Sequence, residues 1–186
     1  MKKILIFTLM ILCLSALYAG DGEHVLTREE PSNFLIDLGL AVVTPQDSED
    51  VRVGLVTGVT FTPAVIWELA IGVKVQFAVT ANPSELIKHE EGILKTLDMS
   101  ATGLLCGKYR WKKSFELYGA LGARYDAFDF ESFSDLDQRW GLVVQGGAHG
   151  RQTDSLGVGV EIEYYKTMTK NASDELGVRA YLSYEI

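Results

Sequence analysis

Residues 65–80 read VIWELAIGVKVQFAVT, and in this segment apolar side chains alternate with polar or small ones. Every second residue from Val65 to Val79 is apolar, whereas the positions between them include Glu68 and Lys74. Successive side chains of a β-strand point to opposite faces, so an alternation of this length indicates a strand. The segment therefore predicts a strand with one apolar face and one polar face.

The same alternation recurs elsewhere in the chain. With residues 65–80 included, the expected strands are 33–42, 51–62, 65–80, 97–111, 115–126, 139–149, 156–164 and 177–186. Beyond residue 19, no uninterrupted apolar stretch is long enough for a membrane-spanning helix. Strands in a bilayer must close into a barrel, because an open sheet edge leaves backbone groups without hydrogen-bond partners. We therefore expect an all-β fold, an eight-stranded antiparallel up-and-down transmembrane β-barrel.

The expected connections alternate in length. Short turns are predicted at residues 62–64, 112–113 and 152–155, and longer loops at residues 82–91, 127–137 and 167–174. Short periplasmic turns and longer outer loops are typical of bacterial outer-membrane barrels. The pattern favours the outer membrane of a Gram-negative bacterium, with both ends of the barrel domain on the periplasmic side.

The N-terminal segment has the features of an export signal. Lys2 and Lys3 precede an apolar run at residues 4–14, and the small-residue segment 15–19 follows it. The run is shorter than a membrane span and has the order of regions found in secretory signal peptides. We expect a cleaved signal peptide at residues 1–19, a periplasmic lead-in at 20–32 and the barrel at 33–186.

Aromatic residues on the apolar row gather near the expected strand ends. The predicted girdle residues are Phe34, Phe61, Trp67, Tyr109, Trp111, Phe115 and Tyr184 at the periplasmic end, and Phe77, Tyr125, Trp140 and Tyr164 at the outer end. Trp67 and Phe77 are about ten residues apart in the sequence, as are Phe115 and Tyr125. At ~3.3 Å per residue and a tilt of ~40°, this spacing rises about 25 Å, the height of the lipid-facing band of such barrels.

Charged residues are confined to the polar row within this band. The interior of an eight-stranded barrel is only wide enough for its own side chains, and unpaired buried charges are costly. We therefore expect a hydrogen-bonded charge network in the lumen, with Arg179 and either Glu161 or Glu163 as its central pair. Its predicted members are Asp37, Glu68, Lys74, Asp98, Glu116, Arg124, Glu161, Glu163 and Arg179.

One alternative fold is compatible with the alternation. A secreted soluble barrel that binds an apolar ligand would place the aliphatic row inside and the charged row in water. The spacing of the aromatic residues and the pattern of the last strand favour the membrane barrel.

In its predicted architecture the chain resembles small eight-stranded outer-membrane proteins of the OmpA transmembrane domain and OmpX type. The last strand alternates through Val178, Ala180, Leu182, Tyr184 and Ile186, although Ile186 replaces the usual terminal phenylalanine. The resemblance covers residues 33–186. It implies that the outer-membrane assembly machinery recognises this strand and that outer-membrane lipid surrounds the barrel.

The sequence contains no arrangement of residues that indicates catalysis. His149 is expected in the lumen network, His89 lies in an acidic outer loop, and Cys106 is a small residue of the polar row. We expect no enzymatic activity, cofactor or metal. A net charge of −8 argues against nucleic acid as a partner, and a monomer is favoured. The preferred function is a structural or surface-interaction barrel with a filled lumen; a lipid-modifying enzyme and a narrow pore remain alternatives.

Overall fold

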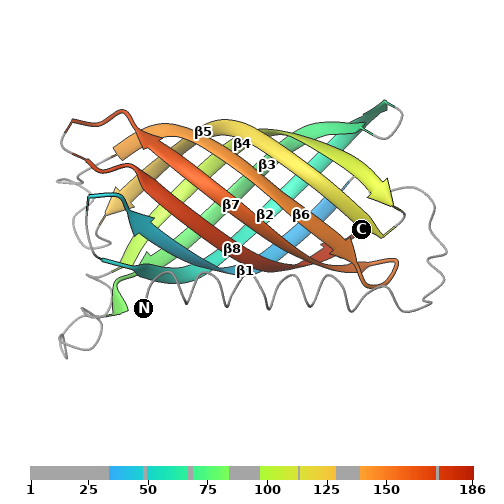
Figure 1. Cartoon of the computed structure of the whole chain (residues 1–186), viewed down its shortest axis with the longest axis horizontal. Helices are drawn as coiled ribbons and strands as arrows, with labels where there is room; N and C mark the ends of the chain where they lie inside the picture. The colour runs from blue at the N-terminus through green and yellow to red at the C-terminus, as the bar shows by residue number, and fades with distance from the viewer. Residues whose placement is uncertain are drawn as a thin grey trace.

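A computed structural model describes residues 34–47, 50–66, 69–83, 97–112, 114–128, 139–170 and 172–186. Its strands are β1 Phe34–Pro45, β2 Arg52–Ile66, β3 Leu69–Ala81, β4 Leu97–Lys112, β5 Phe115–Phe128, β6 Arg139–Arg151, β7 Leu156–Thr167 and β8 Glu175–Glu185. Each strand is antiparallel to the next, and β8 pairs with β1 to close the barrel (Figure 1). The structure confirms the predicted eight-stranded up-and-down barrel.

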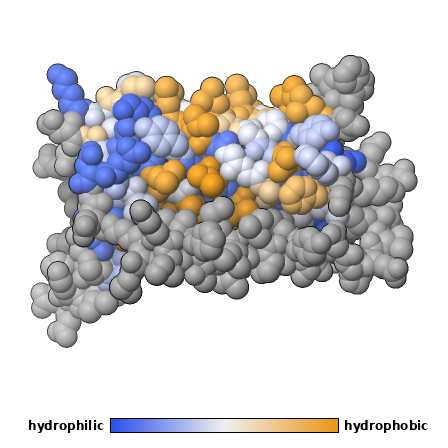
Figure 2. Space-filling view, viewed as in Figure 1, coloured by the Kyte–Doolittle hydropathy of each residue, from blue (hydrophilic) through white to orange (hydrophobic). Residues whose placement is uncertain are grey.

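The apolar row faces outward and the polar row faces the lumen. On β3, exposed and buried side chains alternate from Leu69 to Thr80. Val75 is 45% exposed on the outside, whereas its neighbours Lys74 and Gln76 are buried. Figure 2 shows hydrophobic side chains across the middle of the visible face and hydrophilic ones gathered at its left end. This orientation is the reverse of the one required by the soluble-barrel alternative, so that alternative is wrong.

The first short turn was predicted in the wrong place. The expected turn at residues 62–64 lies inside β2, which continues to Ile66. The pairing register between β2 and β3 shifts between Phe61 and Ala64, which marks a β-bulge around Pro63. Proline has no N–H to give to a ladder but is tolerated at a bulge, so it does not end the strand here. The strand that was expected to start at Val65 starts at Leu69.

The lumen is less polar than the sequence pattern suggested. Inward-facing apolar side chains form two buried clusters. One contains Leu104, Cys106, Ala120, Val143 and Tyr165, and the other contains Ala41, Val43, Val56 and Ala78. The first cluster draws on β4–β7 and the second on β1–β3.

The predicted signal peptide and lead-in lie outside the described residues. Among the described residues, no helix has the length and apolar composition needed to cross a membrane. We call the barrel end with the short turns and the end of β8 the periplasmic end, and the opposite end the outer end.

Candidate functional site

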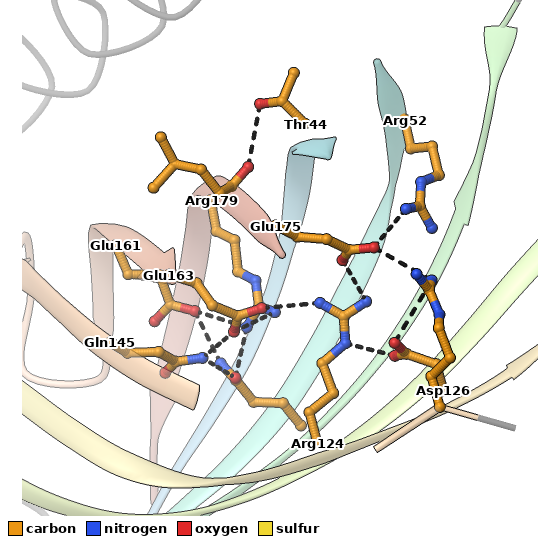
Figure 3. A network of polar contacts seen from close by, with 12 residues as sticks. Thr44, Arg52, Arg124, Asp126, Gln145, Glu161, Glu163, Glu175 and Arg179 are labelled. Atoms are coloured by element: carbon orange, nitrogen blue, oxygen red, sulfur yellow. Dashed lines mark hydrogen bonds and ion pairs between the residues drawn. The ribbon is translucent and has the colours of Figure 1, made fainter. Parts of the chain in front are cut away.

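The lumen contains two connected layers of charged side chains. The first, which we call the outer ion layer, lies at the outer end and comprises Arg52, Asp98, Arg124, Asp126, Arg139 and Glu175. Its centre is Glu175, the first residue of β8. Arg52 contacts Glu175 Oε1, Arg139 Nη2 lies 3.2 Å from the same oxygen, and Arg124 Nη2 lies 3.0 Å from Oε2. One buried carboxylate thus contacts guanidinium groups from β2, β5 and β6 (Figure 3).

Two aspartates complete the outer ion layer. Arg52 Nη1 donates to Asp98 Oδ2 at 2.8 Å, and Arg124 Nε donates to Asp126 Oδ1 at 2.5 Å. Of this layer, the predicted network included only Asp98 and Arg124. It did not include Glu175 because the last strand was expected to start at Gly177. The alternation Glu175, Gly177, Arg179 was the signal that could have placed Glu175 in the lumen.

The second layer, the central ion layer, surrounds Glu161 and comprises Lys74, Gln76, Tyr118, Gln145, Glu161, Glu163 and Arg179. Glu161 is 1% exposed. Its carboxylate accepts hydrogen bonds from Lys74 Nζ at 2.8 Å, Gln76 Nε2 at 2.9 Å and Arg179 Nη1 at 3.1 Å, and also from the Tyr118 hydroxyl. Lys74 and Gln76 belong to β3, which does not pair with β7. Glu161 therefore links opposite walls of the barrel across the lumen.

Glu163 joins the two layers. Arg179 Nη2 lies 2.7 Å from Glu163 Oε2, and Arg124 Nη1 donates to Glu163 Oε1 at 3.2 Å. Gln145 Nε2 also donates to Glu163 Oε2, at 2.5 Å (Figure 3). Arg179 thus contacts both glutamates that were considered for the central pair.

Within the described strands, the inward-facing side chains carry as many negative charges as positive ones. The inward carboxylates are Asp37, Asp98, Glu116, Asp126, Glu161, Glu163, Glu175 and Glu185. The inward cations equal them in number: Arg52, Lys74, Lys108, Arg110, Arg124, Arg139, Arg151 and Arg179. Such a neutral set can be buried at a much lower cost than a set with excess charge, because each ion has a counterion.

A third polar group lies near the periplasmic end. His149 Nε2 is 2.6 Å from Ser183 Oγ, and Glu116 Oε2 is 3.6 Å from His149 Nδ1. Nearer the rim, Arg151 Nε donates to Glu185 Oε1 at 2.9 Å. The sequence placed His149 and Glu116 in the lumen but did not identify Ser183 as the partner of the histidine.

The remaining predicted residues are placed as follows. Asp37 faces the lumen, and its Oδ2 lies 3.8 Å from Lys74 Nζ. Cys106 is buried on the inward row. Glu68 and Trp67, like His89, lie outside the described residues. The girdle residues of the described strands all lie on the outward row: Phe34, Phe61, Phe77, Tyr109, Trp111, Phe115, Tyr125, Trp140, Tyr164 and Tyr184.

Outside the barrel, Asp174 stabilises the loop between β7 and β8. Lys166 Nζ donates to its carboxylate at 2.8 Å, the Tyr164 hydroxyl at 2.9 Å and the Thr167 N–H at 3.1 Å. These hydrogen bonds, led by that from Lys166, lower the pKa of Asp174 below its usual value. The Asp174 carboxylate therefore stays ionised at moderately acidic pH and keeps its hydrogen bonds to these three donors.

The described residues offer little for metal or cofactor chemistry. Within the ranges that the structure describes, no group of three or more histidine, cysteine or carboxylate side chains could hold a metal ion. One chain of contacts resembles a catalytic triad: Ser183 would be the nucleophile, His149 the base and Glu116 the acid that orients the base. All of them face the interior, and Ser183 is 2% exposed.

Comparisons with known proteins agree with this architecture. A family model described as the outer membrane protein beta-barrel domain matches residues 6–182. The fold is similar to that of Ail, the attachment invasion locus protein of Yersinia pestis, with a TM-score of 0.58 and 17% identity over 84% of this chain and 100% of that chain. Neisserial surface protein A has a TM-score of 0.56 and 13% identity over 85% of this chain and 100% of its own.

A third similar structure is OprG from Pseudomonas aeruginosa, with a TM-score of 0.52 and 15% identity over 87% of this chain and 99% of that chain. No curated protein sequence matches this chain. At these identities the structural matches establish the fold alone.

Proposed function

Because this chain belongs to the outer membrane protein beta-barrel domain family and lies in the outer membrane of a Gram-negative bacterium, we propose that it is a closed structural or surface-interaction barrel. In this proposal the barrel neither conducts solutes nor catalyses a reaction. Its lumen serves as a filled support that holds the outer loops in position.

The observation that carries the proposal is the set of contacts between opposite walls of the lumen. Glu161 of β7 accepts from Lys74 of β3, and Glu163 connects this contact to the outer ion layer. An ion passing along the axis would have to displace these pairs. Leaving one partner of a buried pair without its counterion costs about 3–5 kcal/mol, which supports a lumen that is predominantly closed.

The pore alternative is tested by electrical recording. We expect the refolded full-length protein to give no steady unitary conductance in a planar lipid bilayer, because the two ion layers fill the cross-section. In a separate sample, insertion into lipid vesicles is checked by the change in tryptophan fluorescence, to which the outward-facing Trp111 and Trp140 contribute. A reproducible conductance step from inserted protein would overturn the closed-lumen proposal.

One contact in the structure could favour the enzyme alternative: His149 Nε2 lies within hydrogen-bond distance of Ser183 Oγ. A lipid-modifying enzyme needs its nucleophile where an acyl chain can reach it, whereas Ser183 faces the lumen and is buried. We therefore propose that the hydroxyl and the imidazole satisfy each other as a buried hydrogen bond.

This assignment is tested with a fluorophosphonate, which labels activated serines covalently. We expect no labelling of the folded protein in detergent, and the same result for Ser183→Ala. If the folded protein is labelled and Ser183→Ala is not, then the serine is reactive and the non-catalytic proposal fails.

The proposed partners follow from the outward row and from β8. We propose that outer-membrane lipid covers the exposed aliphatic side chains. The outer-membrane assembly machinery would recognise the alternation of Leu182, Tyr184 and Ile186, whose side chains are exposed. We further propose a monomer without nucleic-acid partners, since a closed barrel has no free strand edge to pair with a second copy.

A further inference from the structure

A small cavity lies in the lumen next to the central ion layer, on its periplasmic side. It has a volume of about 10 Å³, which is the space that one water molecule needs. The wall residues that the argument uses are Asp37, Lys74, Lys108, Glu116 and His149; the wall also includes Leu35, Thr60, Cys106, Tyr118 and Tyr181.

The charges on the wall favour a neutral occupant. Asp37 and Glu116 contribute two carboxylates, and Lys74 and Lys108 contribute two ammonium groups. A cation would meet the two lysines, and an anion would meet the two carboxylates. Neither ion would gain a net counter-charge to offset the loss of its hydration.

Two atoms of the wall residues have no hydrogen-bond partner. They are Asp37 Oδ2 and His149 Nδ1, and both side chains are more than nine-tenths buried. Asp37 Oδ2 is an acceptor that needs a donor. His149 Nδ1 is a donor or an acceptor according to the tautomer. Buried polar atoms are rarely left unpaired, and water is small enough for this space and can both donate and accept.

We propose that this cavity binds one ordered water molecule, which donates to Asp37 and completes the hydrogen bonding of His149. Asp37 lies near the start of β1, Glu116 near the start of β5 and His149 near the end of β6, all toward the periplasmic end. The water therefore lies on the periplasmic side of the central ion layer. This inference rests on the closed lumen proposed above.

The test is magnetisation transfer by NMR from water to methyl groups of the full-length protein refolded in detergent micelles. We expect transfer to the methyl groups of Leu35, which line the cavity, and none to those of Val43 or Val143, which are equally buried in the apolar clusters. Absence of transfer to Leu35 would overturn the water site. Transfer to Leu35, Val43 and Val143 alike would indicate general solvent penetration and would overturn a water bound at this site.

A volume-matched pair of variants separates the site from general solvent penetration. Cys106→Leu adds bulk at the cavity wall, and we expect it to abolish the transfer to Leu35. Ala120→Val adds bulk next to Cys106 in the adjacent strand but away from the wall, and we expect it to leave the transfer unchanged. If Cys106→Leu does not fold, the comparison of Leu35 with Val43 and Val143 in the wild-type protein still tests the water site.

The occupant is identified by changing the salt. Exchanging sodium chloride for potassium or for bromide is expected to leave the Leu35 methyl shifts unchanged, since water fills the site. A shift that follows either ion would overturn water as the occupant. The closed-lumen proposal is tested separately by the bilayer recording, in which an open lumen would give a conductance.

Discussion

Replacement of Glu161 by leucine is expected to lower the free energy of unfolding by about 3–5 kcal/mol. The change leaves Lys74 at the centre of the lumen without its 2.8 Å counterion, with only Asp37 at 3.8 Å. Arg179 is affected less, because Glu163 remains 2.7 Å from it. The measurement is a denaturant titration of the refolded protein in lipid vesicles, followed by tryptophan fluorescence.

The double variant Glu161→Leu with Lys74→Met provides the decisive control. Removal of both charges restores the neutrality of the lumen, so we expect about 2 kcal/mol or more of the lost stability to return. Lys166→Met, which removes an exposed ion pair with Asp174, is expected to change the stability little. If the two lumen changes add as independent losses, the Lys74–Glu161 contact does not stabilise the barrel.

Replacement of Leu121 by arginine is expected to cost about 2–4 kcal/mol in lipid. Leu121 lies in the middle of β5 and is 58% exposed on the outward row. In the membrane this position faces hydrocarbon, where a guanidinium loses its hydration. In water the same substitution would be nearly neutral, so the expected loss depends directly on which solvent surrounds the barrel.

Leu156→Arg is the matched control for this second substitution. Leu156 is similarly exposed but is the first residue of β7, at the periplasmic rim. We expect a cost of about 0–1 kcal/mol there, because the side chain reaches the interface. Equal effects at Leu121 and Leu156 would contradict a lipid-facing band centred on the middle of the strands.

The sequence predicted the strand number and the direction of each face because both depend on the alternation itself. A shift of one residue would bring Val75 into the lumen and Lys74 into lipid, so the pattern allows one orientation. The inward position of Glu161, Glu163 and Arg179 follows from the same rule. Their contacts across the lumen do not, because the alternation contains no information about which residues of non-adjacent strands meet.

The errors arise where local chemistry modified the pattern. The predicted turn at residues 62–64 contains Pro63, a residue common in turns, but a bulge accommodates this proline inside β2. Glu175 was left out of the network because the last strand was expected to start at Gly177, whereas β8 starts at Glu175. The alternation with Gly177 and Arg179 gives its inward position, but its contacts with three arginines of other strands depend on the closure of the barrel.

The contact between Lys74 and Glu161 constrains how this protein can enter its membrane. The two residues belong to β3 and β7, with three strands between them in the chain. A hairpin that entered the bilayer alone would expose its ammonium or carboxylate group to acyl chains. This penalty falls only when β3 and β7 come together, so we expect most strands to assemble before the sheet enters the hydrocarbon.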